Sequence, residues 1–174
     1  MQKMDTFSQK IRSLPDNAFS LKGISIRPIQ NDMDLWFAAV ECKLSQEQEE
    51  FVNPAGFSIG RAYLYPESNV PCIIWKGDTR IGYIVLREWQ NNTANSWSFY
   101  LDQSQQHKGY GKTAAMLAVQ ILQSADPAKP IKLSAEASNK KAHSLYTSIG
   151  FLHTGETDGD DLVYTLPASN PSRP

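Results

Sequence analysis

Hydrophobic positions in the first third of the chain recur with the period of a helix. Asn31 or Asp32 can cap a helix whose apolar residues follow the i, i+3, i+4, i+7 pattern of an amphipathic helix. These apolar residues are Met33, Trp36, Phe37 and Val40. Ser45 and Gln48 then have the spacing of a capping box, which predicts the start of a second helix. A third helix is predicted at residues 57–64.

After these helices the pattern changes to the two-residue period of strands. Apolar runs at 72–75 and 81–86 flank a polar turn and predict an antiparallel hairpin. Further strands are predicted at residues 24–29, 96–101, 131–135, 151–153 and 162–166, and further helices at 112–123 and 139–149. This mixture of adjacent strands and interspersed helices indicates an α+β fold.

The length and composition fit one folded domain. Of 174 residues, 41% are hydrophobic, and the 17 basic side chains are nearly balanced by 18 acidic ones. This balance argues against a nucleic-acid partner. Because the chain has no membrane-length apolar stretch and no signal peptide, we expect no membrane partner and a cytoplasmic location. Cys42 and Cys72 lie outside any metal-binding spacing, so no metal is expected.

A glycine-rich turn at residues 106–113 precedes the predicted helix at 112–123. Gly109 and Gly111 can adopt backbone angles that turn successive N–H groups toward one point at the helix N-terminus, and such a point suits an anion. Lys108 and Lys112 add positive charge beside it. The expected ligand of this turn is a pyrophosphate.

Three phosphate-binding motifs compete for this turn. A Walker A loop needs glycine at the position of Gln106, and it needs several parallel βαβ units after the loop. A dinucleotide fingerprint needs a third glycine where the chain has Ala114. The pyrophosphate turn of an acyl-CoA site, Q/R-x-x-G-x-G/A, is satisfied in full by Gln106, Gly109 and Gly111. A glycine loop without any ligand is the remaining alternative.

Two motifs in this order resemble the GNAT superfamily of acyl-CoA-dependent N-acetyltransferases. The first is the strand Phe99–Asp102 with the turn Gln106–Lys112, and the second is Asn139–Phe151, which is similar to N-x-x-A-x-x-L-Y-x-x-x-G-F. The resemblance implies the GNAT fold, a mixed and mostly antiparallel sheet flanked by helices. It divides the chain into an N-terminal extension at 1–22, a GNAT domain at 23–167 and a flexible tail at 168–174.

Within the superfamily the chain is most similar to the bacterial spermine/spermidine (diamine) acetyltransferases. The similar positions are Leu44, Gln48, Phe51-Val52, Ser58-Ile59 and Ile81-Gly82-Tyr83. This resemblance implies acetyl transfer from acetyl-CoA, as cosubstrate, to a primary amine such as spermidine or spermine. Another small amine, a protein amino group and a non-catalytic acyl-CoA-binding module are the alternatives. Members of the family often dimerise, so a homodimer is compatible with the resemblance.

The resemblance also assigns roles to single residues. Tyr146 is the expected acid that protonates the departing CoA sulfur, and a backbone N–H near Leu101 is expected to stabilise the oxygen of the tetrahedral intermediate. The implied cofactor-binding residues are Phe99, Tyr100, Leu101, Gln106, His107, Lys108, Gly109, Tyr110, Gly111, Lys112, Thr113 and Asn139. Glu88, followed by Glu136, is the candidate base for deprotonating the amine, and a chain of waters is the alternative to both.

Overall fold

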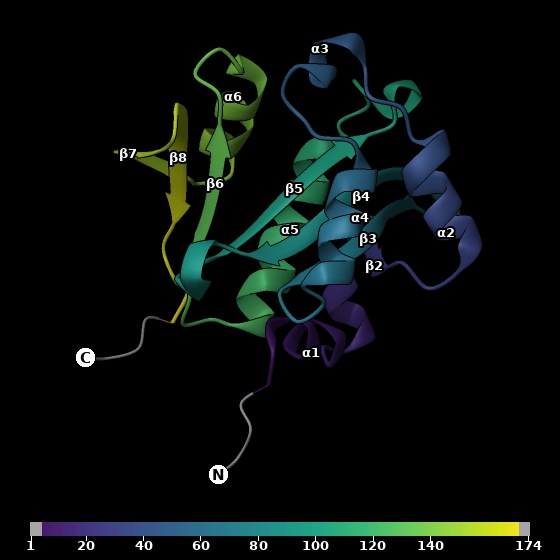
Figure 1. Ribbon diagram of the computed structural model, residues 1–174, viewed down its shortest axis with the longest axis horizontal. Helices are drawn as coiled ribbons and strands as arrows, with labels where there is room; N and C mark the ends of the chain where they lie inside the picture. The colour runs from purple at the N-terminus through teal and green to yellow at the C-terminus, as the bar shows by residue number, and fades with distance from the viewer. Residues whose placement is uncertain (1–4, 171–174) are drawn as a thin grey trace.

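A computed structural model describes residues 5–170 of the chain, and its centre is one eight-stranded sheet (Figure 1). The strands are β1 (Ser20–Leu21), β2 (Ile24–Pro28), β3 (Asn69–Lys76), β4 (Thr79–Glu88), β5 (Asn95–Leu101), β6 (Ile131–Ala135), β7 (Leu152–Asp158) and β8 (Asp161–Leu166). They lie in the order β1-β2-β3-β4-β5-β6-β8-β7. All neighbours are antiparallel except β5 and β6, which are parallel. The predicted mixed, mostly antiparallel sheet is confirmed.

Helices cover both faces of this sheet. They are α1 (Phe7–Arg12), α2 (Asp32–Trp36), α3 (Gln46–Glu49), α4 (Ala55–Leu64), α5 (Tyr110–Ala125) and α6 (Lys140–Ser148). Short 3-10 or π turns occur at η1 (Asp16–Phe19), η2 (Phe37–Glu41), η3 (Gln90–Asn92) and η4 (Gln103–Gln105). Within residues 5–170, no helix combines the length and the apolar character that a membrane crossing requires.

The strand alternation divides the core into two layers. On one face, Ile84, Leu86 and their neighbours pack against α1 and α5. On the other face, Tyr83 and Val85 pack beneath η2 and α4. In Figure 1 the helix α5 lies behind the sheet and α4 lies in front of it. The sheet therefore separates a layer that contains α5 from a layer that contains α4.

Strands β5 and β6 separate along their length. They pair only at Asn95 and Ile131, and Figure 1 shows them diverging from that point. The N–H of Asn95 points toward β6, where it donates to the Pro130 carbonyl at 2.9 Å. Because successive N–H groups of a strand alternate in direction, those of Phe99 and Leu101 also point toward β6. β6 has moved away at that level, so these N–H groups face the opening between the strands.

The predicted N-terminal extension is folded from residue 7 onward. Phe7 is 5% exposed and Ile11 is fully buried, and both belong to the core layer of α5. Leu21 also pairs with Ile24 in the sheet. The first turn of α1 forms a capping box at Thr6. The boundary at residue 22 stays a prediction, and the last four residues of the predicted tail lie outside the described part of the chain.

The predicted apolar stripe of α2 is wrong in its orientation. Met33 and Trp36 are 69% and 58% exposed, and Phe37 is the buried member of the stripe. The buried residue of α2 is Asp34, whose carboxylate pairs with the Arg80 guanidinium at 2.8 Å. This ion pair turns the Asp34 side of α2 toward the sheet, so Met33 and Trp36 face outward, and the backbone then widens into the π turn η2 from Phe37 onward.

Candidate active site

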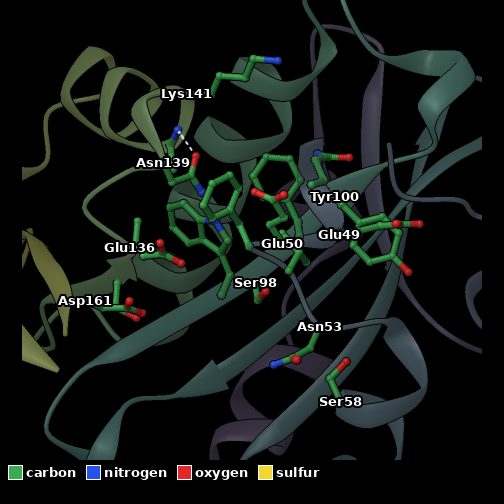
Figure 2. Close-up of a pocket in the computed structure, with 18 of the residues that line it drawn as sticks. Glu49, Glu50, Asn53, Ser58, Ser98, Tyr100, Glu136, Asn139, Lys141 and Asp161 are labelled. Carbon is green, nitrogen blue, oxygen red and sulfur yellow. Dashed lines mark hydrogen bonds between the residues drawn. The ribbon is translucent and has the colours of Figure 1, made fainter. Parts of the chain in front are cut away.

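A cavity of about 1030 Å³ lies where β5 and β6 separate. Its walls come from segments that are far apart in the sequence: α3 and α4, the strands β3 to β6, the start of β8, and α6. Figure 2 shows side chains from these elements converging, with Glu136, Asn139 and Asp161 on one side and Glu49 and Tyr100 on the other. The cavity thus connects the α4 layer with the gap between the two strands.

Four of the predicted site residues line this cavity: Phe99, Tyr100, Asn139 and Tyr146. Asn139 caps α6, because its Oδ1 accepts a hydrogen bond from the Ala142 N–H at 3.1 Å (Figure 2). This cap fixes the start of the helix that carries Tyr146. Phe99 packs against the core layer of α5, so its side chain closes the cavity from that side.

Tyr146 presents a neutral phenol to the cavity. Its half-buried ring lies 6.1 Å from the ring of Phe151 and 5.6 Å from that of Tyr164, measured between centroids. This burial raises the pKa of Tyr146 to about 12, although the charge of Arg87 acts in the opposite direction. The phenol therefore keeps its proton at neutral pH and can donate a hydrogen bond to a developing anion.

The predicted pyrophosphate turn connects β5 to the 16-residue helix α5 and lies outside the lining of the cavity. Gly109 is the N-cap of α5 and has φ +81°. It offers no side-chain cap, so the first N–H groups of α5 have no acceptor within the helix or at its cap. A Cβ at Gly109 would meet no atom of residues 5–170 within 4 Å. The turn has both the free donors and the open space that a diphosphate needs.

Gln106 ties this turn to the end of β5. Its Nε2 donates to the Leu101 carbonyl at 3.1 Å and to Gln48 Oε1 at 2.5 Å. The carbonyl and N–H of one strand residue point the same way, so the bond to Leu101 also marks the direction of the Leu101 N–H. Gln106 therefore joins three parts of the site: the strand end, the turn and the N-terminus of α3.

The remaining residues of the turn lie at the surface or at the start of α5. His107, in the left-handed region with φ +61°, and the side chains of Lys108 and Lys112 are exposed. Lys108 Nζ donates to Gln105 Oε1 at 3.2 Å. Tyr110, Gly111 and Thr113 belong to the first turn of α5 and are partly buried. The positive charge predicted for this turn is thus exposed beside the free N–H groups.

Tyr100 lies on the α4 side of the cavity. Its hydroxyl oxygen accepts a hydrogen bond from the Ala55 N–H at 3.3 Å, and burial raises its pKa to about 12. The neighbouring Tyr83 hydroxyl is 2.7 Å from Ser58 Oγ. Both contacts attach α4 to the sheet, so they fix the distance between α4 and the strands β4 and β5 on this side of the cavity.

The two candidate bases occupy different places. Glu136 lines the cavity, and its Oε1 accepts a hydrogen bond from Ser138 Oγ at 2.7 Å. Glu88 lies in a separate, smaller cavity, where its Oε1 is 3.6 Å from Lys129 Nζ. The geometry therefore leaves Glu136 as the candidate that can meet an amine in the main cavity.

Three charged residues of the cavity were not predicted from the sequence. Asp161 begins β8, Arg61 lies in the last turn of α4, and Arg87 lies near the end of β4. None of them belongs to a contiguous motif. The strand order of the sheet places Arg87 and Asp161, and the packing of α4 on the sheet places Arg61. A single sequence reveals neither.

Comparisons with known proteins agree with this geometry. AAC(6')-Ib in complex with ribostamycin and coenzyme A superimposes with a TM-score of 0.69 at 20% identity, over 84% of this chain and 94% of that one. Spermidine N-acetyltransferase from Vibrio cholerae, in complex with CoA and spermine, has a TM-score of 0.65 at 16% identity, over 83% of this chain and 94% of that one. A putative ribosomal-protein-serine acetyltransferase from Vibrio cholerae has a TM-score of 0.64 at 15% identity, over 86% of this chain and 96% of that one. No curated protein matches the chain.

At these identities the structures establish the fold, and the family follows from the sequence itself. The Acetyltransferase (GNAT) family model matches residues 34–151, which contain the strand β5, the uncapped turn before α5 and the helix of Tyr146. The chain belongs to the GNAT family and is an acetyl-CoA-dependent N-acetyltransferase.

Proposed function

We propose that the acceptor is a primary amine that enters the cavity from the side of α3 and α4. The observation that supports this proposal is the cavity itself, which runs from the α4 layer to the separated strands β5 and β6. Residues 106–113 would hold the diphosphate of acetyl-CoA, which supplies an acetyl thioester as the electrophile. Both reactants would then meet in one cleft, which contributes to rate by proximity and orientation.

The protein groups at the meeting point have complementary roles in this proposal. The Leu101 N–H faces the gap and stabilises the oxygen on which negative charge develops. Tyr146 donates its proton to the departing sulfur, and the proton that the nitrogen loses as the amide forms restores the phenol. Glu136 accepts a proton from the entering ammonium, directly or through water, since an amine must be neutral to attack. No covalent bond to the protein is needed.

The predicted polyamine is the second, finer candidate, and the rim of the cavity supports it. Glu49 and Glu50 line the cavity at α3 and could hold a distal ammonium group. Glu47, on the same helix, is already paired with Lys141. The homodimer and the cytoplasmic location stay predictions from the sequence.

The test is an assay of CoA thiol release, with product identification by mass spectrometry. The panel contains spermidine, an n-alkylamine, an aminoglycoside and a peptide with a free N-terminus, and a reaction without acceptor measures hydrolysis. We expect at least one amine to accelerate thiol release and to appear as its N-acetyl derivative. If acetyl-CoA binds and no amine of the panel is acetylated, the proposed acceptor class is wrong.

A further inference from the structure

Two arginines line the α4 side of the cavity. Arg87 follows Tyr83 and Val85 on the same face of β4, so its side chain lies on the face that α4 covers. Arg61 lies one helical turn after Ser58, and the Ser58 hydroxyl contacts the sheet at Tyr83. Both arginines belong to the lining of the cavity.

Neither arginine has an ion-pair partner among residues 5–170, in contrast to Arg80, which pairs with Asp34. The Nε of Arg87 is buried and has no hydrogen-bond partner in the described part of the chain. The carboxylate whose charge acts on Arg87 is that of Asp158, and it accepts a hydrogen bond from Gln90 Nε2 at 2.8 Å instead. Ser96, directly across from Arg87 in β5, also has a buried hydroxyl that finds no partner among the residues described.

The partial burial of Arg87 is costly for the protein alone, whereas Arg61 is exposed. Burial, together with the positive charge of Arg61, lowers the pKa of Arg87. A guanidinium still keeps its charge at neutral pH, and a partly buried charge is unfavourable until an opposite charge joins it. The planar donors of arginine fit the two oxygens of a carboxylate especially well.

We propose that Arg61 and Arg87 form a subsite for a carboxylate of the acceptor, which makes the acceptor a small, amino-acid-like primary amine. This inference rests on the proposed function, because it places the carboxylate and the reacting amine of one molecule in the same cavity. A polyamine would bring a second ammonium group to the same two guanidinium groups, and like charges repel. The arginines therefore select against the polycation that the acidic rim would otherwise attract.

Matched acceptors test the charge preference. The series consists of ω-amino acids of three to six carbons, each compared with the n-alkylamine and the α,ω-diamine of the same length. At the best length we expect kcat/KM for the amino acid to exceed that for the alkylamine by about 10- to 100-fold, as for hydrogen bonds to a charged group. The diamine should be the poorest substrate of the three.

Arginine variants test the residues. In Arg61→Gln and in Arg87→Gln, the ratio of kcat/KM for the amino acid to that for the alkylamine should fall about tenfold or more. Arg12→Gln is the matched control, because Arg12 is exposed on α1 and contacts Ser8. It should leave the ratio unchanged. Thermal melts confirm folding, and we expect Arg87→Gln to melt no lower than wild type because it removes an unpaired charge.

The outcomes separate this inference from the proposed function. If diamines or alkylamines are acetylated with a kcat/KM equal to that of the amino acids, the proposed function stands and the carboxylate subsite is wrong. If no amine is acetylated, calorimetric titration of 5-aminopentanoate into the protein with bound CoA decides the question. Binding that is lost in Arg87→Gln supports the subsite, while equal binding to both proteins, or none to wild type, overturns it.

Discussion

Tyr146 is the residue on which the proposed chemistry depends most. Its phenol lines the cavity, and burial raises its pKa to about 12. Replacing Tyr146 by Phe removes the hydroxyl and keeps the ring that packs against Phe151 and Tyr164. We expect kcat to fall by about 100-fold, the lower end for loss of an acid catalyst, while the Kd for CoA stays within about twofold. Steady-state kinetics and calorimetry measure the two quantities.

The pH dependence gives a second check on Tyr146. A group with a raised pKa keeps its proton until the pH approaches that higher value, so below about pH 10 only a small fraction of the phenol is ionised. The wild-type rate should therefore show no decline from this group between about pH 7 and 10. An unchanged kcat in Tyr146→Phe would remove Tyr146 from the role of acid.

At the scale of elements, the central feature is the turn that begins α5. Gly109 has φ +81°, and no atom of residues 5–170 lies within 4 Å of the position of a Cβ there. Alanine at this position costs about 1 kcal/mol because of the left-handed backbone, and its methyl group points into the space assigned to the diphosphate. We expect Gly109→Ala to weaken CoA binding by about tenfold or more in a calorimetric titration.

The control for this variant is Gly159→Ala in the turn between β7 and β8. Gly159 also has a positive φ, +61°, and open space around it, so alanine there imposes a similar strain away from the cofactor site. Both variants should lose similar stability, and the control should bind CoA like wild type. Equal CoA affinity in the two variants would contradict the assignment of the turn.

The glycine turn and the Asn139 cap could be predicted because each lies in a contiguous segment whose local geometry follows from its own residues. Tyr146 is indicated only by the resemblance to the family; it lines the cavity, and its role as acid stays a prediction. The orientation of α2 could not be predicted, because it depends on the ion pair between Asp34 and Arg80, which are 46 residues apart. The packing of α1 likewise depends on contacts of Phe7 and Ile11 with distant segments. Local pattern does not encode such pairings.

At the scale of the whole molecule, the sheet register assembles the site. β3, β4 and β5 place Asn69, Arg87 and Ser96 side by side, and the chain returns after α6 to add Asp161 from β8. The sequence predicted the sheet and most of its strands, and it missed the short β1. It could not reveal the charge pattern of the cavity, because that pattern depends on which strands become neighbours.

The most direct test of the account is hydrogen–deuterium exchange of the protein with and without CoA. The first-turn N–H groups of α5 have no acceptor in the helix, and those of Phe99 and Leu101 face the gap beside β6, so all should exchange rapidly in the free protein. At saturating CoA we expect exchange to slow by about tenfold or more in peptides that cover 99–101 and 106–113. Bound CoA that leaves the exchange of both segments unchanged would contradict the assigned cofactor site.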